Sequence, residues 1–261
     1  MTGHHHLLLR GVLLLLTALL APGLLSAARH EPAPGRPPEP PGAQVAATTD
    51  HTDTNPASPP AVTPTSPERR MLPAPAPKGR MSLEETLAAR RSVRLFADKP
   101  LTLEQIAQLC WAAQGITEPQ RGLRTAPSAG AKYPMELYVV SAEGVDHYVP
   151  ASHAFERHLP GDLRPALQQA AYSQECIRQA PACFVVAADV QRTASKYGDR
   201  AERYCFIEAG HIGQNVLLQA TASDLAGVPV GAYDDDAVAA KLRLPANLRV
   251  LYLLPIGHPQ G

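Results

Sequence analysis

The chain of 261 residues carries 24 Lys and Arg side chains against 24 Asp and Glu, so its formal net charge is zero. This balance provides no basic field to attract nucleic acid, and it favours a small-molecule ligand over a polyanionic partner. The four cysteines, Cys110, Cys176, Cys183 and Cys205, lack the spacing of metal ligands, so no metal site is predicted. They are expected to be free, buried thiols, although export would also permit a disulfide between Cys176 and Cys183.

The first 28 residues have the pattern of a secretory signal peptide. Arg10 precedes an apolar core at residues 12–20, Pro22 and Gly23 break the pattern, and small residues up to Ala28 form a cleavage site. The apolar core is shorter than the roughly 20 residues that span a membrane, but an uncleaved N-terminal anchor stays open as an alternative. The leader predicts an exported protein, periplasmic or extracytoplasmic, whose only membrane contact would be this segment.

Residues 29–79 are dominated by Pro, Ala, Thr, Ser and Gly and contain few large apolar side chains. Such a segment cannot bury enough surface to offset the entropy lost on ordering, so a disordered Pro/Ala-rich linker is predicted. Residues 80–261 contain the sequence of one domain, without a visible internal repeat.

Two helix starts in this domain have the same signature. Ser82 with Glu85, and Thr102 with Gln105, each match a capping box, and the second helix is expected to end at Gly115. Further elements are expected from periodicity, as strands at residues 135–140, 145–149, 183–188 and 250–256 and as helices near residues 163–172 and 200–223.

The order of these elements mixes helices and strands without a regular βαβ repeat. This pattern favours an α+β fold over a doubly wound parallel sheet. Along the long helix at residues 200–223, Phe206, Gly210, Gly213 and Leu217 are expected to share one face.

An arginine-rich run opens the domain. Arg90, Arg91 and Arg94 surround Ser92, and three guanidinium groups beside a hydroxyl suit a phosphate. Because Arg90 and Arg94 are four residues apart, we expect them to face the same side of a helical turn and to hold one phosphate from two directions. An isolated run of this kind is also typical of a solvated helix end.

A loop of small residues supplies a second signal, with the sequence Pro127, Ser128, Ala129, Gly130, Ala131. Small side chains allow a flat ring to approach the backbone closely, although a single glycine loop is equally typical of an ordinary tight turn. Together with the arginine run, the loop predicts a phosphorylated cofactor.

Five motifs, in this order along the chain, resemble the nitroreductase-like FMN flavoproteins, and more narrowly their SagB-type (thiazole/oxazole-forming) dehydrogenase branch. The motifs lie at residues 90–94, 127–138, 196–200, 208–215 and 228–233. The resemblance covers essentially all of residues 80–261. It implies a nitroreductase-like fold with a central, mainly antiparallel β-sheet flanked by helices, and a homodimer in which the second subunit completes each FMN pocket.

The resemblance also implies roles for the motif residues. Arg90, Arg91, Ser92 and Arg94 would contact the phosphate and ribityl chain, and the loop of Pro127, Ser128, Ala129, Gly130 and Ala131 would pass along the isoalloxazine. The backbone at Gly231 and Ala232 would lie near flavin N5, and Gln214 and Asn215 would complete the cofactor-binding set.

Lys196 and Tyr197 match the positions that azoline-oxidising relatives use to remove a proton as hydride leaves for the flavin. They are the candidate catalytic residues, with lysine as base and tyrosine orienting or relaying the proton. A surface Lys-Tyr pair ahead of a helix is the alternative, and Lys132-Tyr133 is a rival pair within the cofactor loop. His211 and Glu208 are expected to pack or to position the helix.

The predicted function is FMN-dependent hydride transfer between a small organic substrate and flavin N5, by an oxidoreductase of the SagB-type dehydrogenase kind. Two alternatives stay open. One is reduction of nitroaromatics or quinones with NAD(P)H as the reductant, and the other is a non-catalytic exported protein that binds flavin.

Overall fold

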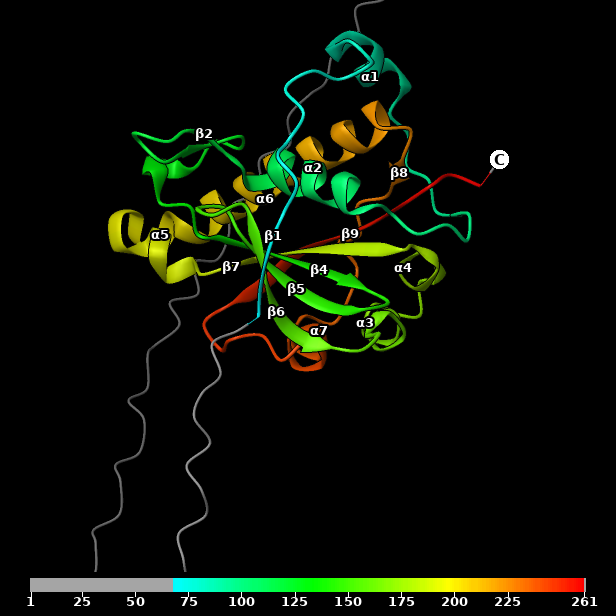
Figure 1. The fold of residues 1–261 in the computed structure, drawn as a ribbon. Coiled ribbons are helices and arrows are strands. Elements are labelled where there is room, and N and C mark those ends of the chain that lie inside the picture. Colours follow the sequence, from blue (N-terminus) through cyan, green and yellow to red (C-terminus); the bar gives the residue numbers. More distant parts are fainter. Residues whose placement is uncertain (1–67, 261) are drawn as a thin grey trace, which may run out of the picture. The chain divides into compact units, whose positions relative to one another are not determined.

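The computed structural model describes residues 68–260, and Figure 1 shows their fold. The predicted leader at residues 1–28 and the linker up to residue 67 lie outside the described residues. A seven-stranded sheet has the order β1-β6-β5-β4-β7-β9-β8, and all of its strand pairs are antiparallel. Its strands are β1 (Arg69–Met71), β4 (Met135–Ser141), β5 (Gly144–Val149), β6 (Ala154–Pro160), β7 (Ala182–Ala188), β8 (Ala226–Gly227) and β9 (Arg249–Gly257).

Seven α-helices accompany the sheet in the described part of the chain. They are α1 (Leu83–Ala89), α2 (Leu103–Gln114), α3 (Arg164–Ala170), α4 (Glu175–Gln179), α5 (Val190–Tyr197), α6 (Ala201–Ala222) and α7 (Asp235–Lys241). The short strands β2 (Ile116–Glu118) and β3 (Leu123–Arg124) form a separate hairpin, and 3-10 turns occupy Ala129–Ala131 and Gly198–Arg200. The α+β class and the mainly antiparallel sheet are confirmed.

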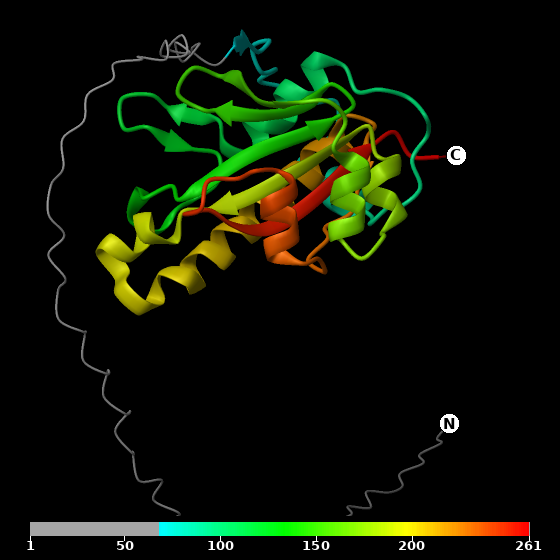
Figure 2. The same ribbon diagram turned by 90° about the horizontal axis from the view of Figure 1, so that it is seen from below.

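The central strand β7 separates two apolar cores. All seven of its residues are buried, because β4 and β9 pair with it on both sides and helices cover both faces. Phe184 and Val186 face the core beneath α2 and α6, whereas Cys183 and Val185 face the core beneath α3, α4 and α7. Figures 1 and 2 show these two helical layers on opposite faces of the sheet.

The predicted capping boxes are both present. The Ser82 and Thr102 side chains each accept a hydrogen bond from the backbone N–H of the third residue of their helix. In turn, the side chains of Glu85 and Gln105 accept hydrogen bonds from the backbone N–H groups of these two cap residues. Gly115 ends α2 by donating its N–H to Trp111 O at 2.7 Å. The four strands and two further helices expected from periodicity are also confirmed. No counterpart was expected for β1, β6, β8, α4, α5, α7 or the β2–β3 hairpin.

The fold begins earlier than the expected domain boundary at residue 80. β1 pairs with β6 from Arg69 opposite Glu156 to Met71 opposite Ala154, and the next residue, Leu72, is buried. The composition of residues 29–79 obscured this strand, because an edge strand is held by backbone hydrogen bonds and its side chains need not be apolar. The last part of the predicted linker therefore belongs to the domain.

The four residues expected to share one face of α6 have the spacing of a common face, but only the C-terminal half of this face is buried. Gly213 and Leu217 are buried, with a Cβ on Gly213 only 2.9 Å from Tyr252 Cε1, but Phe206 and Gly210 are exposed. The buried stripe is rotated around the helix and includes Ala209, Ile212, Val216 and Ala220.

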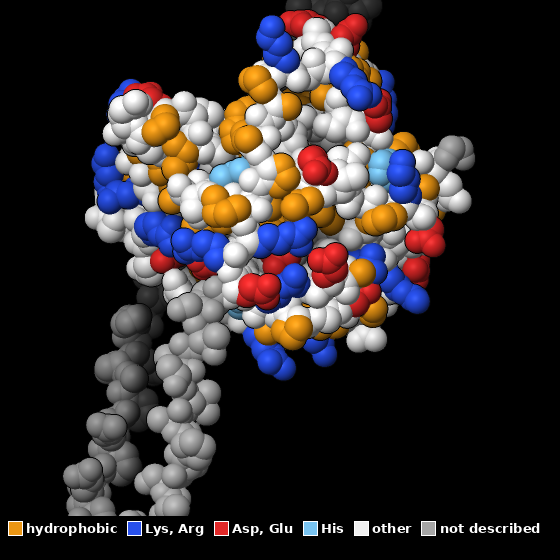
Figure 3. Space-filling model, in the orientation of Figure 1, with side chains coloured by type: hydrophobic (Ala, Val, Ile, Leu, Met, Phe, Trp, Pro, Cys, Tyr) orange, Lys and Arg blue, Asp and Glu red, His pale blue; other side chains and the backbone are white. Residues whose placement is uncertain are grey.

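All four cysteines are free and buried, as expected, and burial raises the pKa of each thiol. Among residues 68–260, no helix combines the length and apolar character required to cross a bilayer. On the face drawn in Figure 3, a band of Lys and Arg side chains is bordered by Asp and Glu, in keeping with the balanced composition.

Candidate functional site

The arginine run forms an extended segment, not a helical turn. Helix α1 ends at Ala89, and Arg90 caps it with extended backbone angles. Ser92 then pairs with Gly227 in a parallel bridge, where the Val93 N–H donates to Gly227 O at 3.0 Å. The prediction of a shared helical turn for Arg90 and Arg94 is therefore wrong. Because alternate residues of an extended chain share a side, we expect Arg90, Ser92 and Arg94 to lie on one side of the segment.

The three guanidinium groups of this segment are available to an anion. Within residues 68–260, none of Arg90, Arg91 and Arg94 forms an ion pair with a carboxylate. Arg91 donates to the backbone oxygens of Ala88 and Arg90, and both Arg91 and Arg94 are exposed. Three uncompensated cations beside a serine hydroxyl match the donor set that a phosphate monoester requires.

The small-residue loop is a 3-10 turn with left-handed backbone. Gly130 has φ of 58° and Ala131 has φ of 51°. The Ser128 Oγ accepts the Tyr133 N–H at 2.8 Å, and the Ala131 N–H donates to Ser128 O at 3.1 Å, so the turn is closed internally. Pro127, Gly130 and Ala131 are exposed and Ala129 is half-buried, which leaves an open, low-profile surface that a flat ring can approach.

Lys196 and Tyr197, the candidate catalytic pair, lie at the C-terminal end of α5 and reach this loop. A Cβ placed on Gly130 would lie 2.8 Å from Tyr197 Oη and 2.9 Å from Lys196 Nζ. Lys196 is exposed, and its Nζ lies 5.4 Å from the centre of the Tyr197 ring, which packs against Tyr204 with 4.9 Å between centroids. Two motifs almost 70 residues apart in sequence thus meet at one glycine.

The remaining predicted residues lie on two other elements. Gln214 is exposed on α6, while Asn215 Nδ2 donates to Thr125 O at 3.5 Å just before the loop. Gly231 and Ala232 are exposed beyond β8, with open space around the Gly231 Cα, and Ala232 O accepts a hydrogen bond from Gln174 at 2.8 Å.

In one chain, the predicted site residues are distributed along the length of α6. Tyr197 packs against Tyr204 in the N-terminal half of α6, whereas α1, which leads into the arginine segment, packs near the C-terminal end of α6 (Figure 1). There, Thr86 and Ala222 line the same cavity of about 310 Å³. At 1.5 Å per residue, the 22 residues of α6 measure about 33 Å, and the two groups pack against different parts of this length.

The family model for the Nitroreductase family matches residues 87–258, which include every predicted site residue. The chain belongs to the nitroreductase family. Nitroreductase-family relatives are oxidoreductases, so this protein is one as well.

Individual proteins similar to this nitroreductase-family chain support the same assignment. A predicted nitroreductase of Methanocaldococcus jannaschii is 40% identical over 184 residues, which are 68% of this chain and 91% of the relative. The crystal structure of a predicted nitroreductase from Ralstonia eutropha has a TM-score of 0.69 at 28% identity, covering 76% of this chain and 93% of that chain. An NADPH:FMN oxidoreductase from Vibrio harveyi, complexed with NAD+, has a TM-score of 0.52 at 25% identity and covers 69% of each chain.

Glu208 is the site feature that sequence reasoning undervalued. It lies on α6 among apolar side chains and is 2% exposed, and its Oε1 has no hydrogen-bond partner among the described residues. Burial raises the pKa of Glu208 to about 7, although the Ser128 hydroxyl and the charges of Arg124 and Arg192 act in the opposite direction. The available signal was a carboxylate within the buried stripe of a helix, between Cys205 and Ile212.

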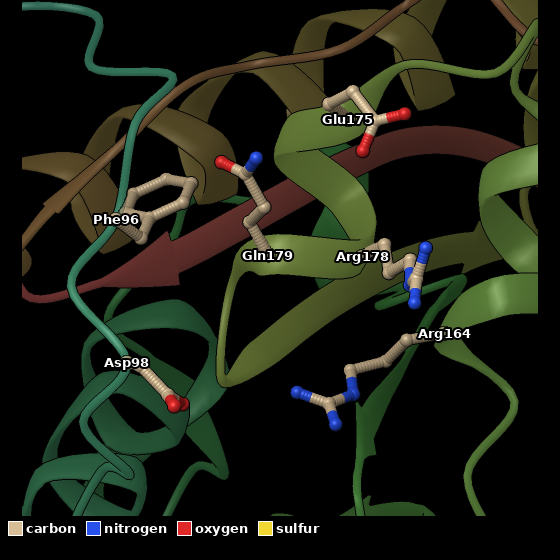
Figure 4. A pocket seen from close by; sticks show the side chains of 6 residues that line it. All are labelled: Phe96, Asp98, Arg164, Glu175, Arg178 and Gln179. Carbon is tan, nitrogen blue, oxygen red and sulfur yellow. The ribbon is translucent and has the colours of Figure 1, made fainter.

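A polar pocket of about 390 Å³ lies elsewhere on the nitroreductase domain, against α3 and α4. Figure 4 shows its lining residues, which are Phe96, Asp98, Arg164, Glu175, Arg178 and Gln179. Arg164 is occupied, since it donates to both carboxylate oxygens of Asp162 and to Ala180 O. The pocket mixes charges of both signs and contains none of the predicted site residues, so we assign it no ligand.

Proposed function

We propose that this protein is an FMN-dependent oxidoreductase of the SagB-type dehydrogenase branch, which transfers hydride between a small organic substrate and flavin. The observation that carries the proposal is the approach of Lys196 and Tyr197 to Gly130 of the small-residue loop. This approach places a candidate base beside the surface on which a flavin ring would lie. The Vibrio harveyi relative, whose name includes FMN, supports the choice of flavin.

The cofactor would be held by residues whose donors are available. Arg90, Arg91 and Arg94 would bind the phosphate through charge-assisted hydrogen bonds, with Ser92 beside them on the ribityl side. The loop from Pro127 to Ala131 would contact the ring, with Gln214 and Asn215 at its flank and the exposed backbone at Gly231 and Ala232 facing N5. When bound, FMN supplies the two-electron acceptor or donor that the side chains lack.

The chain's own contribution to the chemistry would be proton management and orientation. Lys196 would take the substrate proton at Nζ, and Tyr197, fixed by its edge contact with Tyr204, would hold Lys196 and the substrate in place. Lys196 is exposed in the single chain. Water would therefore be excluded from Lys196 only when the cofactor, the substrate and a second subunit cover it.

The separation of the two groups along α6 favours a homodimer. A twofold axis across α6 sets the N-terminal half of one helix beside the C-terminal half of its partner. The loop and Lys196 of one protomer would then meet the arginine segment of the other. This arrangement accounts for a site whose two parts lie along different parts of one helix.

A second candidate function is NAD(P)H-dependent reduction of nitro compounds or quinones, because the named relatives are nitroreductases and an NADPH:FMN oxidoreductase. It uses the same flavin site but requires no base at Lys196. We expect the protein to act outside the cytoplasm, in the periplasm or another extracytoplasmic compartment, and to bind FMN there.

An absorbance spectrum tests the flavin site, which both candidate functions require. Purified full-length protein, after incubation with FMN and removal of the excess, should be yellow, bleach anaerobically with NADPH or dithionite, and regain its colour with an added quinone. Protein that folds but stays colourless contradicts the flavin site. Colour that persists without turnover, for any donor and acceptor pair, indicates a flavin-binding protein and contradicts the enzyme.

A further inference from the structure

One arginine joins the helix that carries Lys196 to the chain that follows the small-residue loop. Arg192 lies on α5, one turn before Lys196, and is half-buried. Its Nη1 donates to Tyr133 O and its Nη2 donates to Glu136 Oε1, each at 2.8 Å. Tyr133 is two residues past the loop, and Glu136 is the second residue of β4. A single guanidinium therefore fastens α5 to the segment that leads from the loop into the sheet.

The topology explains why these two segments meet. β4 pairs with β7 in antiparallel fashion, so the loop enters β4 at the end of the sheet where β7 passes into α5. At this place the Asp189 N–H also donates to Pro134 O at 2.9 Å. Because residues four apart lie on the same side of a helix, an anchor at Arg192 also sets the position of Lys196.

Tyr133 has a backbone conformation that requires support. Its φ of 46° lies in the left-handed region, which is unfavourable for residues other than glycine and persists only where the surroundings hold it. The Tyr133 N–H donates to Ser128 Oγ at 2.8 Å, and Tyr133 Oη accepts the Arg124 N–H at 3.2 Å. The Arg124 Cζ lies 4.6 Å from the centre of the tyrosine ring. The hydrogen bond from Arg192 completes this support, so its loss would loosen the loop.

The second acceptor of Arg192 is a carboxylate that is itself held in place. Glu136 Oε2 lies 2.8 Å from His147 Nε2, and because a carboxylate only accepts, the imidazole donates. Although burial raises the pKa of Glu136, the hydrogen bonds from His147 and Arg192 hold it below its ordinary value. Arg192 also lies 3.8 Å from Asp189 Oδ2. The partners of the guanidinium are therefore all part of the folded domain.

We propose that Arg192 is a positioning residue, which holds α5 against the loop and so keeps Lys196 and Tyr197 beside Gly130. The inference rests on the proposed function for the chemical role of Lys196. A Cβ placed on Gly130 would lie 2.9 Å from Lys196 Nζ, so the two elements are in close contact. At a reacting group, a displacement of about 1 Å can cost about 100-fold in rate.

Hydrogen exchange in the unliganded full-length protein tests the structural part of the inference. Arg192→Met keeps much of the aliphatic stem but has no donor. The amides of Ala131, Lys132 and Tyr133 are hydrogen-bonded within the loop. Loss of a hydrogen bond to a charged group changes an equilibrium by about 10- to 100-fold, so these amides should exchange faster by this factor. The amides of β7 should exchange at the wild-type rate.

Arg164→Met is the matched control. Arg164 also donates to a carboxylate and to a backbone carbonyl, those of Asp162 and Ala180, but it lies on α3, on the opposite face of the sheet from α6. Its loss should leave exchange in the loop unchanged. Wild-type exchange of the loop in Arg192→Met, or equal acceleration in both variants, would overturn the inference whether or not the protein binds flavin. If Arg192→Met does not fold because Glu136 has lost a partner, Arg192→Met combined with Glu136→Gln replaces it.

Steady-state kinetics of the FMN-loaded protein tests the consequence for Lys196. Arg192→Met should lower kcat for oxidation of a thiazoline- or oxazoline-containing peptide by about 10- to 100-fold, because the base is displaced. KM should change only a few-fold, since the base acts on the proton and not on binding. NADPH-driven quinone reduction requires no base and should also change only a few-fold. Arg164→Met should retain both activities.

An unchanged kcat for the peptide in Arg192→Met, or an equal loss in both reactions, would overturn the positioning role. Wild-type protein that binds no FMN, or that oxidises no such peptide, would instead contradict the proposed function. Hydrogen exchange would then decide whether Arg192 holds α5 against the loop.

Discussion

At the residue scale, the structure brings together residues of two motifs that the sequence resemblance had singled out separately. Lys196 and Tyr197 are a surface pair on α5 when the helix is considered alone, and only the packing of α5 beside the loop brings them to Gly130. Lys132, the rival lysine, follows the same loop and is half-buried, but no described contact joins it to Lys196 or Tyr197. The two lysines therefore allow a direct comparison.

Lys196→Ala and Tyr197→Phe together should lower kcat for oxidation of a thiazoline- or oxazoline-containing peptide by roughly 10²- to 10⁴-fold, the usual contribution of general acid–base catalysis. NAD(P)H-driven quinone reduction should change only a few-fold, because it requires no substrate base. Steady-state kinetics of both reactions, with Lys132→Ala as the control, measures the split. If the double variant retains both activities, the catalytic assignment is wrong.

At the scale of elements, the two capping boxes differ in what they support. α2 buries most of one side in the core beneath α6, including Leu109 and Cys110, whereas Thr86 is the only buried residue of α1. The same local signature was recognisable in both sequences, since it depends on side chains three residues apart. The contribution of each capping box to the stability of the domain was not recognisable from the sequence, because that contribution depends on what the helix packs against.

Thr102→Ala should therefore destabilise the whole domain by about 0.5–2 kcal/mol, the usual cost of losing an N-cap. A domain of this size loses about 2–4 °C in Tm per kcal/mol, so a shift of several degrees is expected in a thermal melt. Ser82→Ala is the matched substitution on α1 and should leave Tm nearly unchanged while loosening the arginine segment. Equal shifts in Tm for the two variants would contradict this difference.

At the scale of the whole molecule, α6 leaves an apolar surface uncovered. Phe206 and Ile207 are each 47% exposed, and a Cβ on Gly210 one turn later would meet no atom within 4 Å. A second α6 can approach closely along such a surface. The proposed homodimer would bury it and would join the loop of one protomer to the arginine segment of its partner.

Phe206→Asp should place a carboxylate in that interface and weaken self-association at least about tenfold, which corresponds to about 1.4 kcal/mol. Flavin retention should fall in parallel, because each half-site loses its complement. Light scattering after gel filtration, together with the flavin-to-protein absorbance ratio, measures both effects. Tyr172→Asp, on an exposed tyrosine between α3 and α4, is the control; a dimer that survives Phe206→Asp with its flavin would exclude this interface.

The sequence by itself determined the local features of this protein. Cap residues, the apolar runs of β7 and β9 and the length of α6 depend on neighbours within a few positions, so they were predictable, as was the nitroreductase fold through its five motifs. Only the tertiary structure decided features that depend on distant partners. β1 exists because β6 offers it a free edge. The helical turn expected at Arg90 is extended because Gly227 pairs with Ser92, and the raised pKa of Glu208 arises from its burial in the folded domain.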